Sequence, residues 1–417
     1  MTSKQQVSRR SFIQKGAGAV AMAAPLVMPS RVLSGPNDTI NVGVIGPGRR
    51  GQQIMKDLEG AKGGQIVALS DVNEDRIGML ANGKPWKLYT DFRKMLESKE
   101  VDAVLIATPD HWHALNSIYA CMAGKDVYVE KPMTLTIQEG RVMVQAARKH
   151  KRIVQCGSQQ RSMKACRIGV ELVRQERVGK IKEVHGYRYA SPWDQPFPVD
   201  TPPDGLDWDM WLGPTPKRPY HDDIYTPRAN PGWISIMPFS GGEVTGWGAH
   251  GVDIIQWGLN TEKTGPVEVW LGDNHRELDA PVHMKYANGV LLHMDGKAPE
   301  GGGVFVGEKG SIVVDRGRYQ VTPESLAAVG PDAGNSLYIS NSHMQNWLDC
   351  IRSRELPIAD VEIAHRSTSI CHLMNIVRWT RRKLQWDPDK ERFVDDDDAN
   401  TYIDRPRRSP WELPKIS

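Results

Sequence analysis

Long apolar runs and paired cysteines are both scarce in this chain of 417 residues. No apolar stretch approaches the roughly 20 residues that a membrane-spanning helix needs, so the sequence predicts no stable membrane anchor. The five cysteines are an odd number and show no paired spacing typical of a zinc site. We therefore expect buried free thiols, without a disulfide framework and without a bound metal.

An excess of charge of either sign is also lacking, since the formal net charge is +3. No basic patch with interleaved aromatic residues stands out, which argues against a nucleic-acid partner. With 40% hydrophobic and 25% charged residues, the composition is typical of a soluble globular protein of two domains. The acidic run 395–398 predicts a solvated helix start, and calcium binding there is the less favoured alternative.

The amino terminus carries a pattern typical of an export signal. Residues 8–15 match the twin-arginine pattern, and a short, mildly apolar stretch follows over 16–28. No cysteine lies near its end, so a lipoprotein anchor is not expected. We predict a twin-arginine signal peptide over residues 1–34 and a periplasmic or otherwise exported protein. A helix with two exposed arginines is the alternative.

Residues 40–51 contain a glycine-rich turn that carries the strongest functional signal. An apolar stretch predicts a buried strand, and the glycines that follow let the chain turn tightly, approach a pyrophosphate and open a helix. The amino end of that helix offers unpaired N–H groups to phosphates. The expected cofactor contacts in this turn are Gly46, Gly48, Arg49, Arg50 and Gly51.

A second strand, predicted over residues 65–69, ends just before Asp71. A carboxylate at this distance from the glycine turn can accept hydrogen bonds from the ribose hydroxyls and would repel a 2′-phosphate. The sequence therefore predicts NAD, with NADP less favoured. A surface turn with an N-capping acid is the alternative.

Strand-like and helix-like patterns alternate from residue 37 to residue 155, which predicts a doubly wound parallel sheet. Beyond residue 156 the pattern changes, and four or five strand-like runs with an Asn-Gly hairpin signal predict an antiparallel sheet in an α/β domain over 156–417. Between them, the Pro-, Gly- and Trp-rich segment 191–247 predicts a long loop that covers a site. Its aromatic residues either stack on sugars or, as we favour, pin the loop down.

The turns that follow two predicted strands hold the first candidate catalytic residues. Lys131 follows the strand at 126–130, at the sheet edge where the nicotinamide end of a dinucleotide lies, and could donate to a substrate hydroxyl and take part in proton transfer. An exposed, salt-bridging lysine is the alternative. His113 either caps the next helix or touches the cofactor. The expected cofactor contacts on this edge are Thr108, Pro109, His113, Glu130 and Lys131.

A glycine-rich stretch leads into a helix predicted to begin near Gly248. His250 and Asp253 are three residues apart and share one helical face. A histidine titrates near neutrality and is a natural acid–base partner for a sugar hydroxyl. Asp253 joins it as a candidate catalytic residue, although it could instead orient the histidine or pair with an arginine.

These motifs occur in one order, and from Thr39 to Trp411 the chain resembles the Gfo/Idh/MocA family of glucose–fructose oxidoreductases and inositol dehydrogenases. The resemblance implies a Rossmann domain followed by an α/β domain with a large, mainly antiparallel sheet that often mediates dimers or tetramers. It also implies that Lys131 and His250 are catalytic. Many members have an aspartate where this chain has Gly246. Either Asp253 or Glu243 would supply the carboxylate, or the site does something other than plain alcohol oxidation.

Together, these features predict an exported, NAD-dependent oxidoreductase acting on a sugar or polyol, in a homo-oligomer. Free NAD is scarce outside the cytoplasm, so the cofactor should be held tightly and regenerated within the catalytic cycle. One alternative is an NAD-dependent glycosidase like the α-N-acetylgalactosaminidases of this family, which oxidise, eliminate and reduce without net redox change. Another is a non-catalytic sugar- or nucleotide-binding protein.

Overall fold

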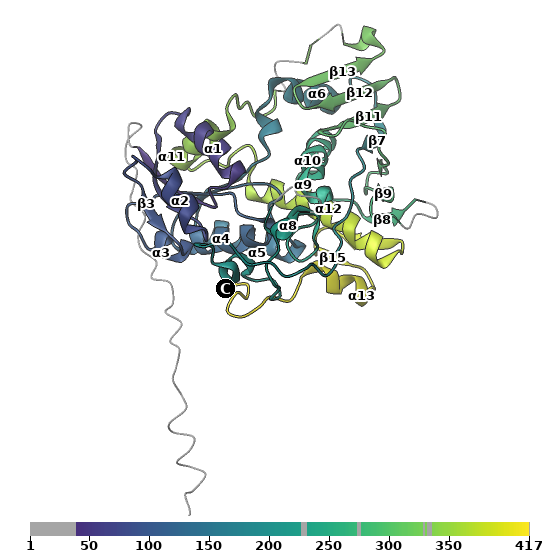
Figure 1. Ribbon diagram of the computed structural model, residues 1–417. Coiled ribbons are helices and arrows are strands. Elements are labelled where there is room, and N and C mark those ends of the chain that lie inside the picture. The colour runs from purple at the N-terminus through teal and green to yellow at the C-terminus, as the bar shows by residue number, and fades with distance from the viewer. Residues whose placement is uncertain (1–38, 227–231, 273–276, 328–329, 332–335, 417) are drawn as a thin grey trace, which may run out of the picture.

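The computed structural model describes residues 39–226, 232–272, 277–327, 330–331 and 336–416 (Figure 1). The predicted signal peptide lies outside the described residues. Among those that are described, no helix is both long and apolar enough to cross a membrane. All five cysteines fall within the described ranges, and each is buried and free of a disulfide, as predicted.

The first domain is a parallel sheet covered by helices. Within the described residues the sheet has six strands in the order β3-β2-β1-β4-β5-β6. The strands are β1 (Ile40–Ile45), β2 (Gly64–Ser70), β3 (Lys87–Tyr89), β4 (Ala103–Ile106), β5 (Asp126–Val129) and β6 (Val154–Cys156). The helices are α1 (Arg49–Glu59), α2 (Glu74–Leu80), α3 (Phe92–Leu96), α4 (Asp110–Met122) and α5 (Ile137–Lys149). The order reverses between β1 and β4, where sheets of this kind bind ligands.

The second domain places helices against a larger sheet. Within the described part of the chain this sheet has nine strands in the order β13-β12-β11-β7-β10-β9-β8-β14-β15. Only the pairing of β10 with β7 is parallel among these. The predicted fold, a Rossmann domain followed by an α/β domain with a mainly antiparallel sheet, is confirmed.

The remaining elements have the following bounds. The strands are β7 (Ile181–Gly186), β8 (Glu268–Leu271), β9 (Val282–Lys285), β10 (Leu291–Met294), β11 (Gly303–Gly307), β12 (Ser311–Asp315), β13 (Arg318–Thr322), β14 (Leu384–Asp387) and β15 (Arg392–Phe393). The α-helices are α6 (Lys164–Arg174), α7 (Trp208–Leu212), α8 (Asp222–Tyr225), α9 (Glu243–Gly246), α10 (Gly248–Leu259), α11 (His343–Ser353), α12 (Val361–Thr380) and α13 (Asp397–Asn400). The short 3-10 helices are η2 (Gln159–Ser162), η3 (Trp233–Ser235), η4 (Glu324–Leu326) and η6 (Thr401–Ile403).

The acidic run 395–398 forms the helix start that its sequence predicts. Asp396 is the N-cap of α13, and its side chain accepts a hydrogen bond from the Ala399 N–H group. Asp396 and Asp398 also pair with Arg382. No cluster of His, Cys, Asp and Glu suited to a metal ion occurs among the residues described.

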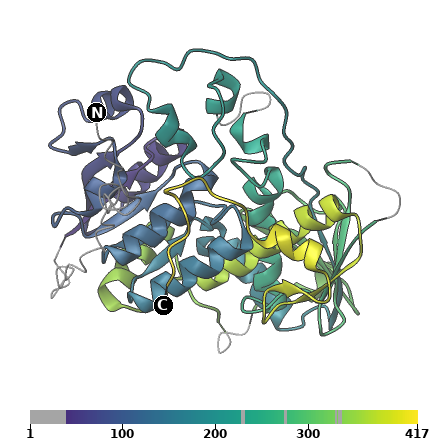
Figure 2. The same cartoon turned by 90° about the horizontal axis from the view of Figure 1, so that it is seen from below.

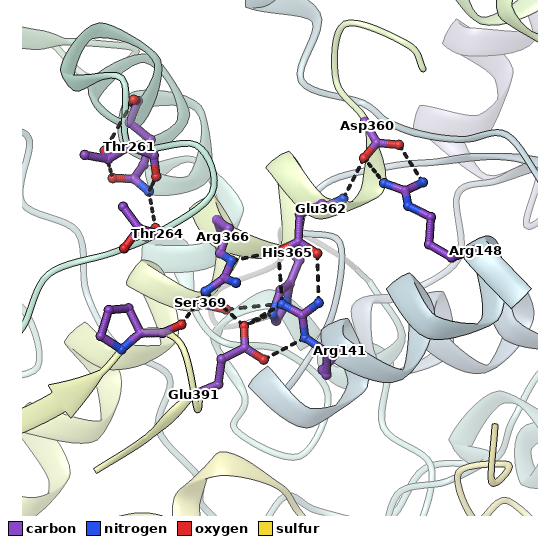
Figure 3. Close-up of polar contacts among 12 residues, drawn as sticks. Arg141, Arg148, Thr261, Thr264, Asp360, Glu362, His365, Arg366, Ser369 and Glu391 are labelled. Atoms are coloured by element: carbon purple, nitrogen blue, oxygen red, sulfur yellow. Dashed lines mark hydrogen bonds and ion pairs between the residues drawn. The ribbon is translucent and has the colours of Figure 1, made fainter. Parts of the chain in front are cut away.

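Helix α12 joins the two domains, because it packs against α5 of the first domain and α10 of the second. A polar network reinforces this junction (Figure 3). Arg141 of α5 donates hydrogen bonds at 2.8 Å both to Glu362 of α12 and to Glu391. These partners lie far apart in the sequence, so the network ties the first domain to the second.

The described part of segment 191–247 (residues 191–226 and 232–247) crosses from the second domain to the first and returns, as Figure 2 shows for the teal trace. It docks on the turn after β2, where the Glu74 N–H donates to Gly205 O and the Asp207 N–H donates to Val72 O, both at 2.9 Å. Most of its aromatic residues pack among themselves; Trp208 stacks on Trp211 with ring centroids 4.6 Å apart. Most of these side chains thus hold the segment in place by packing against one another, which is the role that the sequence analysis favours.

Candidate active site

A cavity of about 720 Å³ lies at the carboxyl edge of the parallel sheet and is lined by residues of both domains. It brings together nearly all of the residues that the sequence analysis selects. Those that line it are Gly46, Gly48, Arg49, Arg50, Asp71, Thr108, Pro109, His113, Glu130, Lys131 and His250. Gly51 and Asp253 are the two selected residues outside this lining.

The glycine turn is shaped so that a phosphate can approach the backbone. Gly46 has a φ of +77°, and a Cβ there would lie 2.9 Å from the backbone of Thr108. A Cβ at Gly51 would lie 2.5 Å from Gly46 O, whereas a Cβ at Gly48 would meet no atom within 4 Å. Gly51 therefore serves close packing of helix on strand, and Gly48 leaves open space at the uncapped start of α1. The residues fit a dinucleotide pyrophosphate.

Glu130 is almost completely buried at the end of β5 and holds several elements together. Its Oε1 accepts hydrogen bonds from Arg50 Nη2 at 2.8 Å and from Gln159 Nε2 at 3.0 Å. Burial acts to lower the pKa of Arg50, but the Glu130 carboxylate outweighs it and raises that pKa. This ion pair ties the glycine turn to the strand that delivers Lys131.

Asp71 has a cationic partner that the sequence analysis misses. Arg76 Nη1 donates to both carboxylate oxygens of Asp71, at 3.1 and 3.3 Å, and lines the same cavity. Arg76 Nη2 also donates to the hydroxyl of Tyr225, at 2.5 Å, so the crossing segment closes this end of the cavity. Burial raises the pKa of Asp71 although Arg76 opposes that rise. The sequence spacing between Asp71 and Arg76 does not reveal this ion pair, because the side chain of an arginine at the start of α2 can point in several directions.

Lys131 and His250 line the same cavity and are close enough to interact electrostatically. Lys131 Nζ donates to Gly246 O at 3.0 Å and lies 6.0 Å from the centroid of the Trp247 ring. His250 is only 5% exposed, and burial together with Lys131, Arg316 and Arg50 lowers its pKa well below 6.5. The imidazole of His250 is therefore neutral at physiological pH.

His113 joins the two turns that form this edge. Its Nδ1 lies 2.7 Å from Pro132 O and its Nε2 lies 2.8 Å from Thr108 O. Both partners are carbonyl oxygens, which only accept hydrogen bonds, so a ring nitrogen that carries a hydrogen has an acceptor on either side. His113 does not cap α4, because the N-cap is Pro109, without a side-chain hydrogen bond. It fixes the Lys131 turn instead and lines the cavity.

Asp253 lies away from the cavity and forms a buried ion pair. Arg161 donates to its two oxygens at 2.7 and 2.8 Å, and the Ser367 hydroxyl donates at 2.8 Å. The Arg161 and Asp253 side chains are 1% and 2% exposed. Of the roles considered for Asp253, the structure therefore supports pairing with an arginine, and Asp253 does not line the cavity in which a catalytic role was expected.

Glu243 lies beside the position that distinguishes this chain from many relatives. A Cβ at Gly246 would lie 3.0 Å from Glu243 Oε2, so this carboxylate takes the place where a side chain at residue 246 would begin. Two further charged residues that the sequence analysis did not select, Asp110 and Arg316, line the cavity. Asp110 stands between Pro109 and His113 in the selected turn, whereas Arg316 comes from the β12–β13 turn and has no motif of its own.

Comparison with known proteins agrees with the fold. Residues 40–158 match a model described as the oxidoreductase family NAD-binding Rossmann fold, and residues 173–413 match a model of its C-terminal α/β domain. The WlbA dehydrogenase from Bordetella pertussis, solved with NADH and UDP-GlcNAcA, superposes with a TM-score of 0.62 at 19% identity, over 84% of this chain and 99% of that one.

Among curated proteins, the inositol 2-dehydrogenase/D-chiro-inositol 3-dehydrogenase of Shouchella clausii is 35% identical over 34% of this chain and 42% of its own length. A glycosyl hydrolase family 109 protein of Solibacter usitatus is 34% identical over 25% of this chain and 26% of its own length. The chain thus aligns with less than half the length of these curated relatives.

Proposed function

Because this chain belongs to the Gfo/Idh/MocA oxidoreductase family, we propose that it is an NAD-dependent enzyme that transfers a hydride between a sugar or polyol and its cofactor. The observation that carries the proposal is the shared cavity, whose wall holds the glycine turn and Asp71 together with Lys131 and His250. The similarity to an inositol dehydrogenase supports a polyhydroxylated substrate.

When bound, NAD supplies the hydride acceptor for alcohol oxidation. Gly46, Gly48 and the start of α1 would hold its pyrophosphate, and Asp71 would hold the adenosine ribose. Lys131 would donate to the oxygen of the reacting hydroxyl and stabilise negative charge as it develops there. Neutral His250 offers a second polar contact to the same hydroxyl. Trp233 and Trp247, which also line the cavity, offer ring faces to a sugar.

Replacing Asp71 with alanine is expected to weaken the selectivity for NAD over NADP. The substitution removes the carboxylate that repels a 2′-phosphate and leaves Arg76 free to bind one, so the ratio of the two dissociation constants should fall about tenfold or more. Titration of protein fluorescence with NADH and NADPH measures this ratio. Asp75→Ala, which removes an exposed neighbouring acid outside the cavity lining, is the control. A wild-type protein that prefers NADPH would contradict the assignment.

We further propose that the protein is exported by the twin-arginine route and carries its cofactor with it. The pattern at residues 8–15 supports export, and the docking of residues 191–226 on the turn that follows Asp71 supports slow cofactor loss. Purified without added nucleotide and then denatured, the mature protein should release about one NAD(H) per chain by mass spectrometry. An empty protein that binds added NAD reversibly would contradict a self-recycling exported enzyme.

A second candidate reaction is glycoside cleavage through oxidation, elimination and reduction, and the similarity to a glycosyl hydrolase family 109 protein favours it. Release of nitrophenol from nitrophenyl glycosides, without net formation of NADH, would distinguish it from plain oxidation. The large sheet of the second domain supports a homo-oligomer, for which light scattering on the mature protein is the measurement.

A further inference from the structure

Asp110 is the first residue of α4 and lies 3% exposed in the wall of the cavity. Its Oδ2 accepts a hydrogen bond from the Ser240 hydroxyl at 2.6 Å. Its Oδ1 accepts no hydrogen bond from any residue that the structure describes. This oxygen is also absent from the set of unpaired polar atoms that are sealed off inside the protein, so a small molecule can reach it. An ionised carboxylate has about four acceptor positions, and buried ones are normally satisfied. Oδ1 is therefore left for a molecule in the cavity.

The neighbours of Asp110 partly offset the cost of burying its carboxylate. His113, one helical turn along α4, and Lys131 favour the charged form, while Glu243 acts in the opposite sense. The amino end of α4 adds a favourable dipole. Ser240 belongs to the second domain, and its Oγ also accepts from the Gly242 N–H at 3.2 Å. Asp110 thereby anchors the segment that leads to His250.

Alcohol oxidation releases a proton, and the other two candidate groups, Lys131 and His250, are poorly matched to receive it. Lys131 Nζ already donates a hydrogen bond, to Gly246 O. His250 has a pKa held well below 6.5 by burial and by three nearby cations. Burial raises the pKa of Asp110 to about 6, with His113, Ser240 and Lys131 opposing the rise. A proton acceptor works best when its pKa lies near the operating pH.

We propose that Asp110 is a catalytic residue whose Oδ1 binds the hydroxyl being oxidised and takes up its proton, and this inference rests on the proposed function. In oxidation the C–H bond breaks and its hydrogen leaves with both electrons to the oxidised cofactor. The O–H bond breaks, its proton bonds to Asp110, and the C=O double bond forms. Lys131 stays protonated and stabilises the oxygen. Reduction runs in reverse, with Asp110 returning the proton.

The test replaces Asp110 with asparagine, which keeps the shape but cannot accept the proton. NADH binding is followed by fluorescence, and reduction of bound NAD by myo-inositol, D-glucose and D-glucuronate is followed by stopped flow across the pH range. We expect the NADH dissociation constant of D110N to stay within about threefold of wild type, because Asp110 serves the substrate. The reduction rate should fall by about 10²-fold or more.

The pH profile separates a catalytic role from a structural one. Only the deprotonated carboxylate accepts a proton, so the wild-type rate should rise with pH through about 6, and D110N should lack this rise. Ser240→Ala removes a hydrogen bond that lowers the pKa of Asp110, so it should move the rise to higher pH. Asp360→Asn is the matched control, because Asp360 is also buried at a helix start but pairs with Arg148 outside the cavity.

Each outcome decides one point. A D110N protein as fast as wild type, or an S240A profile that does not move, overturns the role of Asp110 alone. Weaker NADH binding with an unchanged rate at saturating cofactor also overturns it, because Asp110 would then serve the cofactor. A wild-type protein whose bound NAD none of the three compounds reduces overturns the proposed function itself.

Discussion

Replacing Lys131 with methionine is expected to abolish hydride transfer while leaving NAD bound. The Nζ group of Lys131 lies between Gly246 O and the Trp247 ring, at the end of the cavity that the substrate would enter. Methionine keeps much of the side-chain volume but removes the positive charge that stabilises an alkoxide. The rate constant for reduction of bound NAD should fall by about 10²- to 10⁴-fold.

Two measurements make the Lys131→Met result interpretable. The dissociation constant for NADH should change little, since the pyrophosphate and adenosine ends of the cavity are formed by other residues. Lys182→Met, which removes an exposed lysine paired loosely with Glu308 in the second domain, should leave the rate unchanged. A K131M enzyme with the wild-type rate would remove Lys131 from the mechanism, whatever its effect on binding.

Replacing Asp253 with alanine is expected to destabilise the protein strongly. The substitution takes both oxygens away from Arg161, which is 1% exposed and, among the residues that the structure describes, keeps Glu262 alone as an ionic partner. Breaking a buried ion pair by removing one partner costs about 3–5 kcal/mol, because an incompletely compensated charge stays buried. The midpoint of thermal unfolding should fall by roughly 6–20 °C for domains of this size.

The matched control for Asp253 is an exposed pair of the same kind. Asp398→Ala breaks a contact with Arg382 in which the side chains are 65% and 45% exposed, so its effect should stay below about 1 kcal/mol. Calorimetry on both variants, each saturated with NADH, provides the comparison. If D253A unfolds at the same temperature as the wild-type protein, the buried pair contributes nothing to stability and the structural assignment of Asp253 fails.

Asp253 shows where spacing stops being informative. The sequence places His250 and Asp253 on one helical face, yet in α10 every residue from Gly248 to Gly258 is buried. A helix that is covered on all sides has no solvent face to orient it. Spacing therefore says that two side chains point the same way but not which neighbour they meet. His250 faces the cavity, and Asp253 meets Arg161, which is 92 residues away in the sequence.

The boundary between α12 and β14 illustrates the same limit for a secondary-structure element. The structure has α12 over Val361–Thr380, and Leu384 already begins β14. Arg381 takes a left-handed conformation after the helix, with a φ of +54°. Strand β14 pairs with β8, which is distant in sequence. A partner strand of this kind determines where the helix ends and the strand begins. Local residue propensities carry no information about such a distant partner.

The sequence by itself determined the parallel sheet, the glycine turn, the acid after β2 and the lysine after β5. These follow from patterns of a few residues and from the rule that carboxyl ends of parallel strands share one edge. Only the tertiary structure decided that Arg76 pairs with Asp71 and that Asp253 forms an ion pair with Arg161. It also decided that Asp110 lies in the cavity wall, where it accepts a hydrogen bond from Ser240, 130 residues away in the sequence. Each of these pairings depends on the direction of side chains brought together by the packing of helices and domains, which no local pattern encodes.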